Sequence, residues 1–403
     1  MPIATSPAVP QRRNVAVLAL AQALFMSVQG MGASANPLAG YALLGADEKW
    51  LATAPVFAMQ LGIMMATVPA SLLMAVVGRR AGFSLGALLG VLGGALGCVA
   101  LYRQSFALLC IASLCQGTQA AFFWYFRLAA ADGSPPQLRA KAISLVMAGG
   151  VLAGLLGPQT AKWSVDWLAA TFAGVYVAMA CFSLAVLVLV QLLQIPGLST
   201  ADRAAGGRPM RVIARQPAYR VALASSVLGY TVMTLTMSAT PLAMQACGFA
   251  FGDSATVIQA HIVAMFLPSF FSGHLIMRLG VPAVIATGAV IELCGALTNL
   301  SGVAFDHFML ANVLIGVGWN FTYVGGSTLL ISTHEPAERA KVQASHDFTV
   351  YAATATAAAL SGVLQAKAGW AVINLATLPL MAAVLGAALW LVARQRRAPV
   401  PAE

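Results

Sequence analysis

Long apolar stretches separated by short polar ones run through the whole chain. A helix that crosses about 30 Å of hydrocarbon needs about 20 consecutive, mostly apolar residues. Twelve stretches meet this requirement, so the pattern predicts twelve transmembrane helices with boundaries good to a few residues. They cover approximately residues 15–44, 52–76, 82–102, 106–130, 140–161, 168–193, 219–246, 255–277, 281–303, 308–332, 342–366 and 370–393.

The composition agrees with a chain that is solvated mainly by lipid. Of its 403 residues, 60% are hydrophobic and only 8% are charged, and the mean hydropathy is +0.84. A soluble domain is typically about 25% charged, so this chain cannot cover a water-facing surface. Its net charge of +10 does not indicate nucleic-acid binding, because the basic residues lie between apolar runs and form no stripe or tail.

The positions of lysine and arginine predict the orientation. With the N-terminus in the cytoplasm, most basic residues fall on that side, including those near both ends and those of the middle linker. The opposite side receives only Lys49, Arg103, Lys162 and Lys367. By the positive-inside rule, we expect a multi-pass protein of the inner (plasma) membrane with both termini cytoplasmic.

The first apolar stretch also resembles a secretory signal, because it follows Arg12 and Arg13 and precedes an Ala-Ser-Ala cleavage pattern at 33–35. The alternative is an uncleaved first transmembrane helix. We favour that alternative because many further spans follow and the apolar pattern continues past Pro37 to Leu44.

The chain repeats itself at about half its length. Ser-Ala-x-Pro-Leu-Ala occurs at 34–39 and 238–243, a glycine follows the second and eighth spans at Gly78 and Gly280, and Pro-x-x-Arg-Ala-Lys occurs at 136–141 and 336–341. We infer two six-helix halves, 1–193 and 219–403, joined by a cytoplasmic linker at 194–218. Parallel halves are a known transporter plan, with the binding site at their interface near the membrane midplane.

Twelve spans, two repeated halves and a basic loop after the second span together resemble the major facilitator superfamily over nearly the whole chain. In that family the loop reads roughly Gly-x-x-x-Asp-Arg-x-Gly-Arg-Arg. Gly78, Arg79 and Arg80 match its end, whereas Ala75 stands at the acidic position and Ser71 at the first glycine. The resemblance implies an all-α integral membrane fold that rocks two halves around a central site.

The second copy of this loop matches at Gly273, Arg278 and Gly280, but Met277 replaces the acidic residue. The resemblance implies that Arg79, Arg80 and Arg278 contribute to a cytoplasmic gate. Because the acidic member is missing from both copies, we expect the gate to use other contacts.

Polar and aromatic residues recur at helical spacing inside four predicted spans. Lipid makes such residues costly, so they usually face the interior of the bundle or a wet cavity. The candidates for substrate binding are Gln22 and Gln29 in the first span, Gln116, Gln119, Phe123 and Arg127 in the fourth, Tyr230 and Thr234 in the seventh, and Trp319, Asn320 and Tyr323 in the tenth.

The family resemblance implies that these four spans line the transport path. Two alternatives remain open: the amides can instead bond neighbouring helices, and Arg127 can extend its guanidinium to the membrane surface as an anchor. A pocket with these residues is mostly uncharged, aromatic and rich in amides, which suits a planar or amphipathic organic molecule.

Coupling to protons needs a group that can change its protonation state. Glu292 lies in the middle of the ninth span and is the only acidic residue deep in any predicted span. His346 and Asp347 lie in the first turns of the eleventh span. Structural roles are the alternatives: a hydrogen-bonded buried Glu292, and an Asp347 favoured by the helix N-terminal dipole.

No enzyme site is recognisable. The chain has no Walker-type phosphate loop, and its six cysteines show no metal-ligand spacing. We therefore expect no cofactor and no metal. The expected partners are a small organic substrate, protons and the lipid bilayer, with no nucleic acid and with the chain acting as a monomer.

The sequence thus predicts a secondary active transporter that works by alternating access and is coupled to protons. Efflux of a drug or metabolite is favoured, because Gly149, Gly150, Gly154 and the Gly-Pro at 157–158 resemble the glycine-rich motif of the family's antiporters. Close packing of small residues is the other explanation of this pattern. The alternatives in function are a proton-coupled uptake permease for a planar aromatic metabolite and a membrane receptor without flux.

Overall fold

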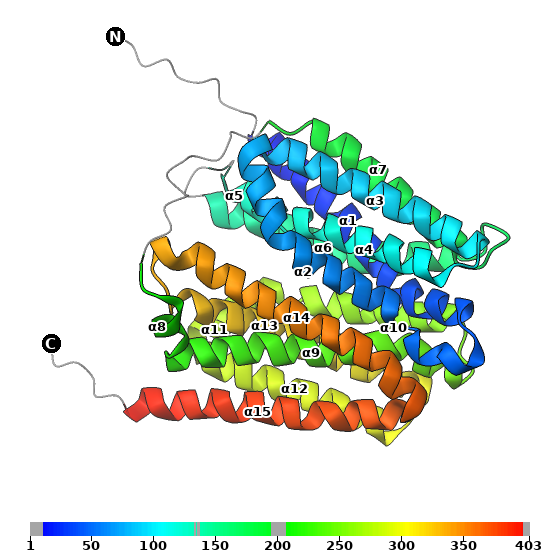
Figure 1. Ribbon diagram of the computed structural model, residues 1–403. Helices are drawn as coiled ribbons and strands as arrows, with labels where there is room; N and C mark the ends of the chain where they lie inside the picture. The colour runs from blue at the N-terminus through cyan, green and yellow to red at the C-terminus, as the bar shows by residue number, and fades with distance from the viewer. Residues whose placement is uncertain (1–10, 133, 135–137, 195–206, 398–403) are drawn as a thin grey trace, which may run out of the picture. The chain divides into compact units, whose positions relative to one another are not determined.

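The computed structural model describes residues 11–132, 134, 138–194 and 207–397, and its regular structure there is entirely helical (Figure 1). Parts of the predicted linker and of the loop at 136–141 lie outside these residues. The helices are α1 (Gln11–Leu43), η1 (Ala46–Leu51), α2 (Ala54–Val77), α3 (Arg79–Tyr102), α4 (Phe106–Phe123), α5 (Phe126–Asp132), α6 (Arg139–Ser164), α7 (Ala173–Gln191), α8 (Met210–Ala214), α9 (Pro217–Ala246), α10 (Phe251–Phe266), α11 (Ser269–Leu279), α12 (Val281–Ser301), α13 (Phe305–Ile331), η4 (Pro336–Glu338), α14 (Arg339–Lys367) and α15 (Gly369–Arg397).

The described helices agree with the predicted spans. Ten are long and apolar enough to cross a membrane, and the bent pair α10 and α11 makes an eleventh. The twelfth is α14, whose 29 residues would extend about 44 Å although polar residues lower its hydropathy. The chain is therefore an all-α, multi-pass membrane protein, as predicted.

The chain divides into two compact units. The first comprises 1–35 and 61–202, and the second comprises 36–60 and 203–403. The boundary at 202 falls within the predicted linker, but the sequence did not indicate that 36–60, the end of α1 and the start of α2, would group with the second unit. The predicted boundaries of the two halves themselves remain a prediction.

Close helix packing through glycine holds the first unit together. A Cβ on Gly94 of α3 would lie 2.7 Å from the carbonyl oxygen of Tyr176, and one on Gly97 would overlap the Tyr176 ring. Helices α3 and α7 can approach this closely only because both positions lack a side chain. Small residues commonly mediate helix contacts in membranes, where lipid competes for apolar surfaces.

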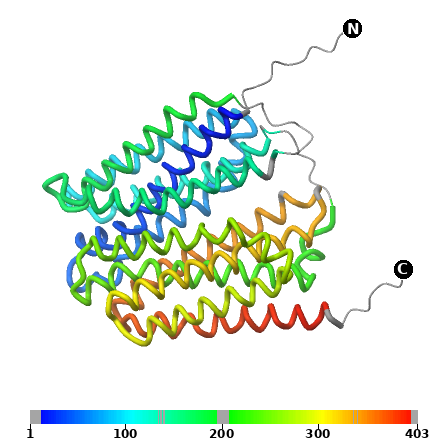
Figure 2. Tube along the Cα trace, turned by 180° about the vertical axis from the view of Figure 1, so that it is seen from behind, coloured from blue at the N-terminus to red at the C-terminus, as the bar shows by residue number. Residues whose placement is uncertain are grey.

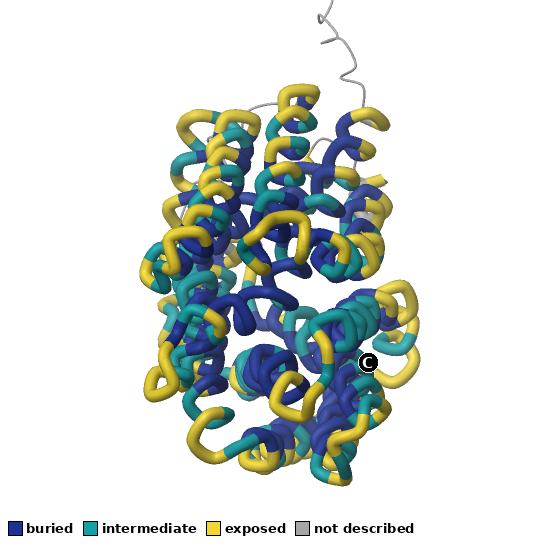
Figure 3. The backbone as a smooth tube through the Cα atoms, turned by 90° about the vertical axis from the view of Figure 1, so that its right-hand side faces the viewer, coloured by how far each residue is buried: buried dark blue, intermediate teal, exposed yellow. Residues whose placement is uncertain are grey.

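The second unit packs α9 against α13, α14 and α15, and α12 against α13 and α15. Ile213, Tyr219, Ile285, Leu329 and Met381 belong to one buried cluster there. Figure 2 shows the long, uninterrupted α15 at one edge of this unit. In Figure 3 buried positions gather on the inner sides of the helices, and exposed positions lie on their outer sides and at the turns.

Thr53, between η1 and α2, bonds through its hydroxyl to two backbone groups of α14 within the second unit. Its hydroxyl donates to the carbonyl oxygen of Ala358 (2.6 Å) and accepts the N–H of Gly362 (3.0 Å). These two residues are four apart and would otherwise bond each other in an α-helix. A Cβ on Gly362 would lie 2.8 Å from the carbonyl oxygen of Trp50, so glycine is required for this approach.

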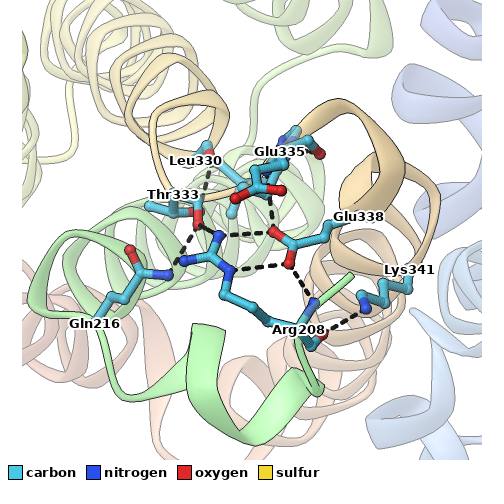
Figure 4. A network of polar contacts seen from close by, with 8 residues as sticks. Arg208, Gln216, Leu330, Thr333, Glu335, Glu338 and Lys341 are labelled. Carbon is cyan, nitrogen blue, oxygen red and sulfur yellow. Dashed lines mark hydrogen bonds and ion pairs between the residues drawn. The ribbon is translucent and has the colours of Figure 1, made fainter. Parts of the chain in front are cut away.

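Arg208, at the start of the described part of the linker, is held by Glu338 before α14 (Figure 4). The Arg208 backbone N–H, Nε and Nη2 donate to the Glu338 carboxylate at 2.6, 2.9 and 2.7 Å, and Lys341 donates to the Arg208 carbonyl oxygen. The hydrogen bonds from Arg208 lower the pKa of Glu338 below its usual range. The repeated loop of the first half has Leu138 at the corresponding position, so it cannot form the same ion pair.

We predict that Gly362→Ala destabilises the protein. The new methyl group would overlap the Trp50 carbonyl oxygen and the Thr53 hydroxyl, and overpacking of this kind typically costs about 1–3 kcal/mol. Gly386→Ala on α15 is the matched control, because a Cβ there has no atom within 4 Å and alanine is the better helix former by about 1 kcal/mol. The measurement is thermal unfolding in detergent; equal melting temperatures for the two variants would contradict the close contact.

We also predict that Glu338→Gln lowers thermal stability at neutral pH. A carboxylate whose pKa is lowered on folding stabilises the folded state above its unfolded pKa of about 4.3, and this stabilisation is lost as the pH falls through the folded pKa. The gap in melting temperature between wild type and variant should therefore be constant above about pH 5 and narrow in more acidic buffers. Glu335→Gln, at an exposed neighbouring position, should show no such gap, and a gap that widens in acid would refute the assignment.

Candidate functional site

Five aromatic side chains of the second unit form a cluster, here called the aromatic cluster. Trp319 and Tyr323 of α13 stack with ring centroids 5.1 Å apart and planes 8° apart. Tyr230 of α9 contacts both rings nearly edge-on, at 5.3 and 5.4 Å. Phe266 of α10 lies 6.3 Å from Trp319 and Tyr351 of α14 lies 6.5 Å from Tyr230. The cluster therefore joins four helices.

The four-residue spacing of Trp319 and Tyr323 along α13 explains why their rings stack. Residues four apart lie on one face of a helix, so Trp319 and Tyr323 present parallel rings to Tyr230. Trp319 is 6% exposed, whereas Tyr230 and Tyr323 are only partly buried. The Trp319 Nε1–H is buried and has no hydrogen-bond partner among the described residues, so the cluster combines stacked rings with one unused donor.

His346 and Asp347 of α14 lie beside the aromatic cluster. The His346 ring is 6.4 Å from Tyr323, and its Nδ1 lies 3.0 Å from Asp347 Oδ1, which also accepts from Gln343 at 2.8 Å. In the tautomer that donates from Nδ1 to Asp347, Nε2 of the neutral ring is an acceptor. That nitrogen is buried without a partner in the described part of the chain.

The structure thus brings together residues that the sequence assigned to two roles. Tyr230, Trp319 and Tyr323 were candidates for substrate binding, and His346 and Asp347 were candidates for proton coupling. The sequence reasoning missed Phe266 and Tyr351. A signal for Tyr351 was available, because it follows Asp347 by four residues and so lies on the same side of α14.

Two other candidates of the second unit have different surroundings. Asn320 donates from Nδ2 to the carbonyl oxygen of Met265 and to the hydroxyl of Ser269, both at 2.7 Å, so its amide binds the bent pair α10 and α11. Thr234 is buried on α9, one turn after Tyr230. Direct contact of either residue with a substrate remains a prediction.

Glu292 of α12 is completely buried against α13. Its Oε1 lies 2.9 Å from the Thr322 hydroxyl, which is also 3.1 Å from the Gly318 carbonyl oxygen. A hydroxyl has one proton, so Thr322 donates to only one of these oxygens at a time. Glu292 therefore contacts the same turn of α13 that carries Trp319, but through a different side chain.

In the first unit, the candidate amides of α4 bond to α7. Gln116 donates to the sulfur of Met179 and Gln119 to the hydroxyl of Ser183, both at 3.0 Å. Both glutamines are at most 1% exposed. This geometry favours the alternative in which the amides join neighbouring helices.

Phe123 lies inside a cluster of phenylalanines and is fully buried. Its ring centroid is 5.0 Å from Phe25, 6.5 Å from Phe83 and 4.7 Å from Phe126. Its surroundings are those of a packing residue, and its predicted contact with substrate gains no support from this position.

Two of the three remaining polar candidates of the first unit retain unused hydrogen-bonding atoms. Gln29 Nε2 and Arg127 Nε are buried without a partner among the described residues, and both side chains are partly buried. Gln22 is 4% exposed. Arg127 lies on α5, just after the chain turns at 124–125, so the predicted fourth span is two helices at this end.

The predicted gate arginines have three different environments. Arg79 forms an ion pair with Asp132 at the end of α5, which supplies an acidic partner that the loop lacks at Ala75. Arg80 donates to the Gln191 side chain at 3.1 and 3.3 Å, whereas Arg278 is exposed. Asp132 was missed because it lies just beyond the predicted span.

Comparisons with known proteins place these features in context. No family model matches the chain. The chain is 36% identical over 377 residues to the riboflavin transporter RfnT of Brucella anthropi, covering 93% of this chain and 94% of that protein. It is 28% identical over 387 residues to the uncharacterised MFS-type transporter YdeG of Bacillus subtilis, covering 90% and 88%.

A solved structure shares the fold. The major facilitator superfamily transporter FucP, crystallised in the outward conformation, superimposes with a TM-score of 0.59 at 16% identity, covering 93% of this chain and 98% of that chain. The predicted family is therefore confirmed by near full-length relatives and by the twelve-helix architecture. The chain belongs to the major facilitator superfamily of membrane transporters.

Proposed function

We propose that the chain carries a planar aromatic metabolite of the riboflavin type into the cell across the plasma membrane. The observation that carries this proposal is the aromatic cluster, in which the parallel rings of Trp319 and Tyr323 lie next to His346. The name of the relative at 36% identity indicates the same class of substrate. The sequence left both export and uptake open as the direction of transport, and we favour uptake.

The chemistry of the cluster suits a fused-ring substrate. Aromatic rings attract one another in offset-stacked or edge-on arrangements, worth about 0.5–1.5 kcal/mol per pair beyond the area they bury. The isoalloxazine of riboflavin is planar, apolar on its two faces and polar along one edge. Its ring carbonyls match the unused Nε1–H donor of Trp319, and its imide N–H matches the free acceptor Nε2 of His346.

The main sequence argument for export is weakened by how the glycines of α6 pack. A Cβ on Gly149 would lie 2.9 Å from the carbonyl oxygen of Ala19, and one on Gly157 would lie 2.6 Å from that of Ser27. Both glycines are thus accounted for by close contact of α6 with α1. The antiporter resemblance of this helix then needs no functional explanation, and uptake of a vitamin-like compound is the simpler proposal.

For coupling we propose the pair His346 and Asp347, because it borders the aromatic cluster through Tyr323. A proton bound by this pair changes its charge and its hydrogen-bond donors at the edge of the substrate site. Glu292 is the second candidate, since Thr322 connects it to the same helix turn. The sequence-based hypothesis of proton coupling therefore has a specific location to test.

We predict that Trp319→Ala weakens riboflavin binding by about tenfold or more, since it removes the indole ring at the centre of the cluster and its buried area. Quenching of riboflavin fluorescence by the detergent-purified protein measures the dissociation constant. Trp390→Ala is the matched control, because Trp390 of α15 is 50% exposed and lies outside the aromatic cluster. Equal affinities of the two variants would exclude the cluster as the site.

We further predict uptake that is driven by a pH gradient and depends on Asp347. Wild type should restore growth of a riboflavin auxotroph that lacks its own permease, and proteoliposomes should accumulate riboflavin when the outside is acidified. Asp347→Asn should abolish gradient-driven accumulation while leaving counterflow intact, because exchange needs no net proton movement. Accumulation that survives in both Asp347→Asn and Glu292→Gln would reject this coupling, and binding without counterflow in the wild type would favour a receptor.

A further inference from the structure

The eighth span is not one helix in the second unit. Helix α10 ends at Phe266, α11 begins at Ser269, and the two axes are bent by 44°. Pro268 lies in the break, and proline has no N–H to donate to the carbonyl four residues before it. The two pieces are labelled in Figure 1.

One side chain bonds to both sides of this break. Asn320 Nδ2 donates to the carbonyl oxygen of Met265, before the break, and to the Ser269 hydroxyl after it, each at 2.7 Å. The Met265 oxygen can only accept, so the amide nitrogen must face it and the orientation of the Asn320 amide is fixed. Both of its N–H groups are used at the break.

Proline alone does not explain the break. The first half also has a proline in its second span, Pro69, nine residues before Gly78 where Pro268 lies twelve before Gly280. Helix α2 nevertheless continues without interruption from Ala54 to Val77. The residue 200 positions before Asn320 is Ala120, which has no amide to offer. The half with the break is thus the half in which a neighbouring amide binds a backbone carbonyl just before the break, that of Met265.

The two sides of the break are anchored differently. Before it, α10 is fixed to α13, because His261 Nδ1 lies 2.7 Å from the Asn312 carbonyl oxygen and a Cβ on Gly316 would lie 2.7 Å from the His261 carbonyl oxygen. After it, α11 presents Phe270 and Met277 outward, which are 59% and 77% exposed. Asn320 is therefore a polar connection from α13 to the outer piece.

We propose that residues 267–268 form a hinge and that Asn320 is the positioning residue that sets its angle. Trp319 precedes Asn320 on α13 and contacts Phe266 at the end of α10. A ring that stacks on Trp319 therefore acts on the side chains that border the hinge. In this respect the inference rests on the proposed function. The occupancy of the aromatic cluster by substrate and the angle between α10 and α11 change together during transport.

Distances between spin labels test the hinge directly. Labels are placed at Met277→Cys on α11 and Leu297→Cys on α12, both in exposed positions, in a background whose six native cysteines are replaced. Without substrate, we expect the wild type to show a single narrow distance distribution. In Asn320→Ala this distribution should broaden or shift. It should change less in Ser269→Ala, because that variant keeps the bond from Asn320 to Met265. Riboflavin should shift the wild-type distribution.

Asn312→Ala is the matched control, because Asn312 is a buried amide of the same helix that bonds to Phe308 at 2.9 Å and does not contact the break through its side chain. It should leave the distance distribution unchanged even if it lowers stability. In transport assays, Asn320→Ala should reduce turnover about tenfold, as expected from two lost hydrogen bonds, with little change in the dissociation constant. Asn320→Gln, which keeps the amide, should recover part of the turnover.

The outcomes separate the hinge from the substrate site. An unchanged distance distribution in Asn320→Ala overturns the hinge. Loss of affinity in Asn320→Ala with an unchanged distribution also overturns it and makes Asn320 a direct contact. If wild type fails to bind riboflavin but Asn320→Ala still alters the distribution, the proposed substrate is wrong and the positioning role of Asn320 stands.

Discussion

A polar group inside a bilayer has no water to bond to, and the structure of this chain follows from that constraint. An unsatisfied backbone or side-chain group in hydrocarbon costs several kcal/mol, and several polar residues of the spans have partners on other helices. Gln119 bonds Ser183, Asn320 bonds Met265, and Thr53 inserts into the backbone of α14. These contacts decide which helices meet and where one of them is interrupted.

The same constraint explains why the candidate site is built from aromatic rings. Gln116, Gln119 and Asn320 already bond to other helices. Tyrosine and tryptophan can instead offer a ring face to a substrate without leaving several polar atoms unpaired when the site is empty. Among the polar atoms of Trp319, Tyr323 and Tyr230, the Trp319 indole N–H is the one that is fully buried without a partner in the described part of the chain, and His346 adds a polar group at their edge.

The sequence predicted the architecture well because each span carries its own signal. About 20 apolar residues suffice to identify a transmembrane helix, and even the polar α14 was found between two clear loops. Spacing also showed which residues share a helix face, as for Trp319 and Tyr323. It could not show which neighbour that face meets, so Gln116 and Gln119 were grouped with the ring-bearing residues although they bond α7.

For the same reason, contacts between segments that are far apart in the chain could not be predicted from the sequence. Nothing near Arg79 indicated Asp132, and nothing near Arg208 indicated Glu338. Pro69 lies inside the unbroken α2, whereas Pro268 lies at the break between α10 and α11, so a proline in the sequence did not by itself show which of these spans would bend.

The two repeated halves have diverged at the positions where a polar side chain bridges helices. Glu338 stands where the first half has Leu138, and Asn320 stands where it has Ala120. The first half instead turns its chain between α4 and α5, next to the buried ring of Phe123, whereas α13 runs unbroken past Trp319. An unbroken α13 beside a bent eighth span places the ring surface and the proposed hinge in the same half. On that proposal, substrate binding and helix movement are coupled within one half, through neighbouring residues of a single helix.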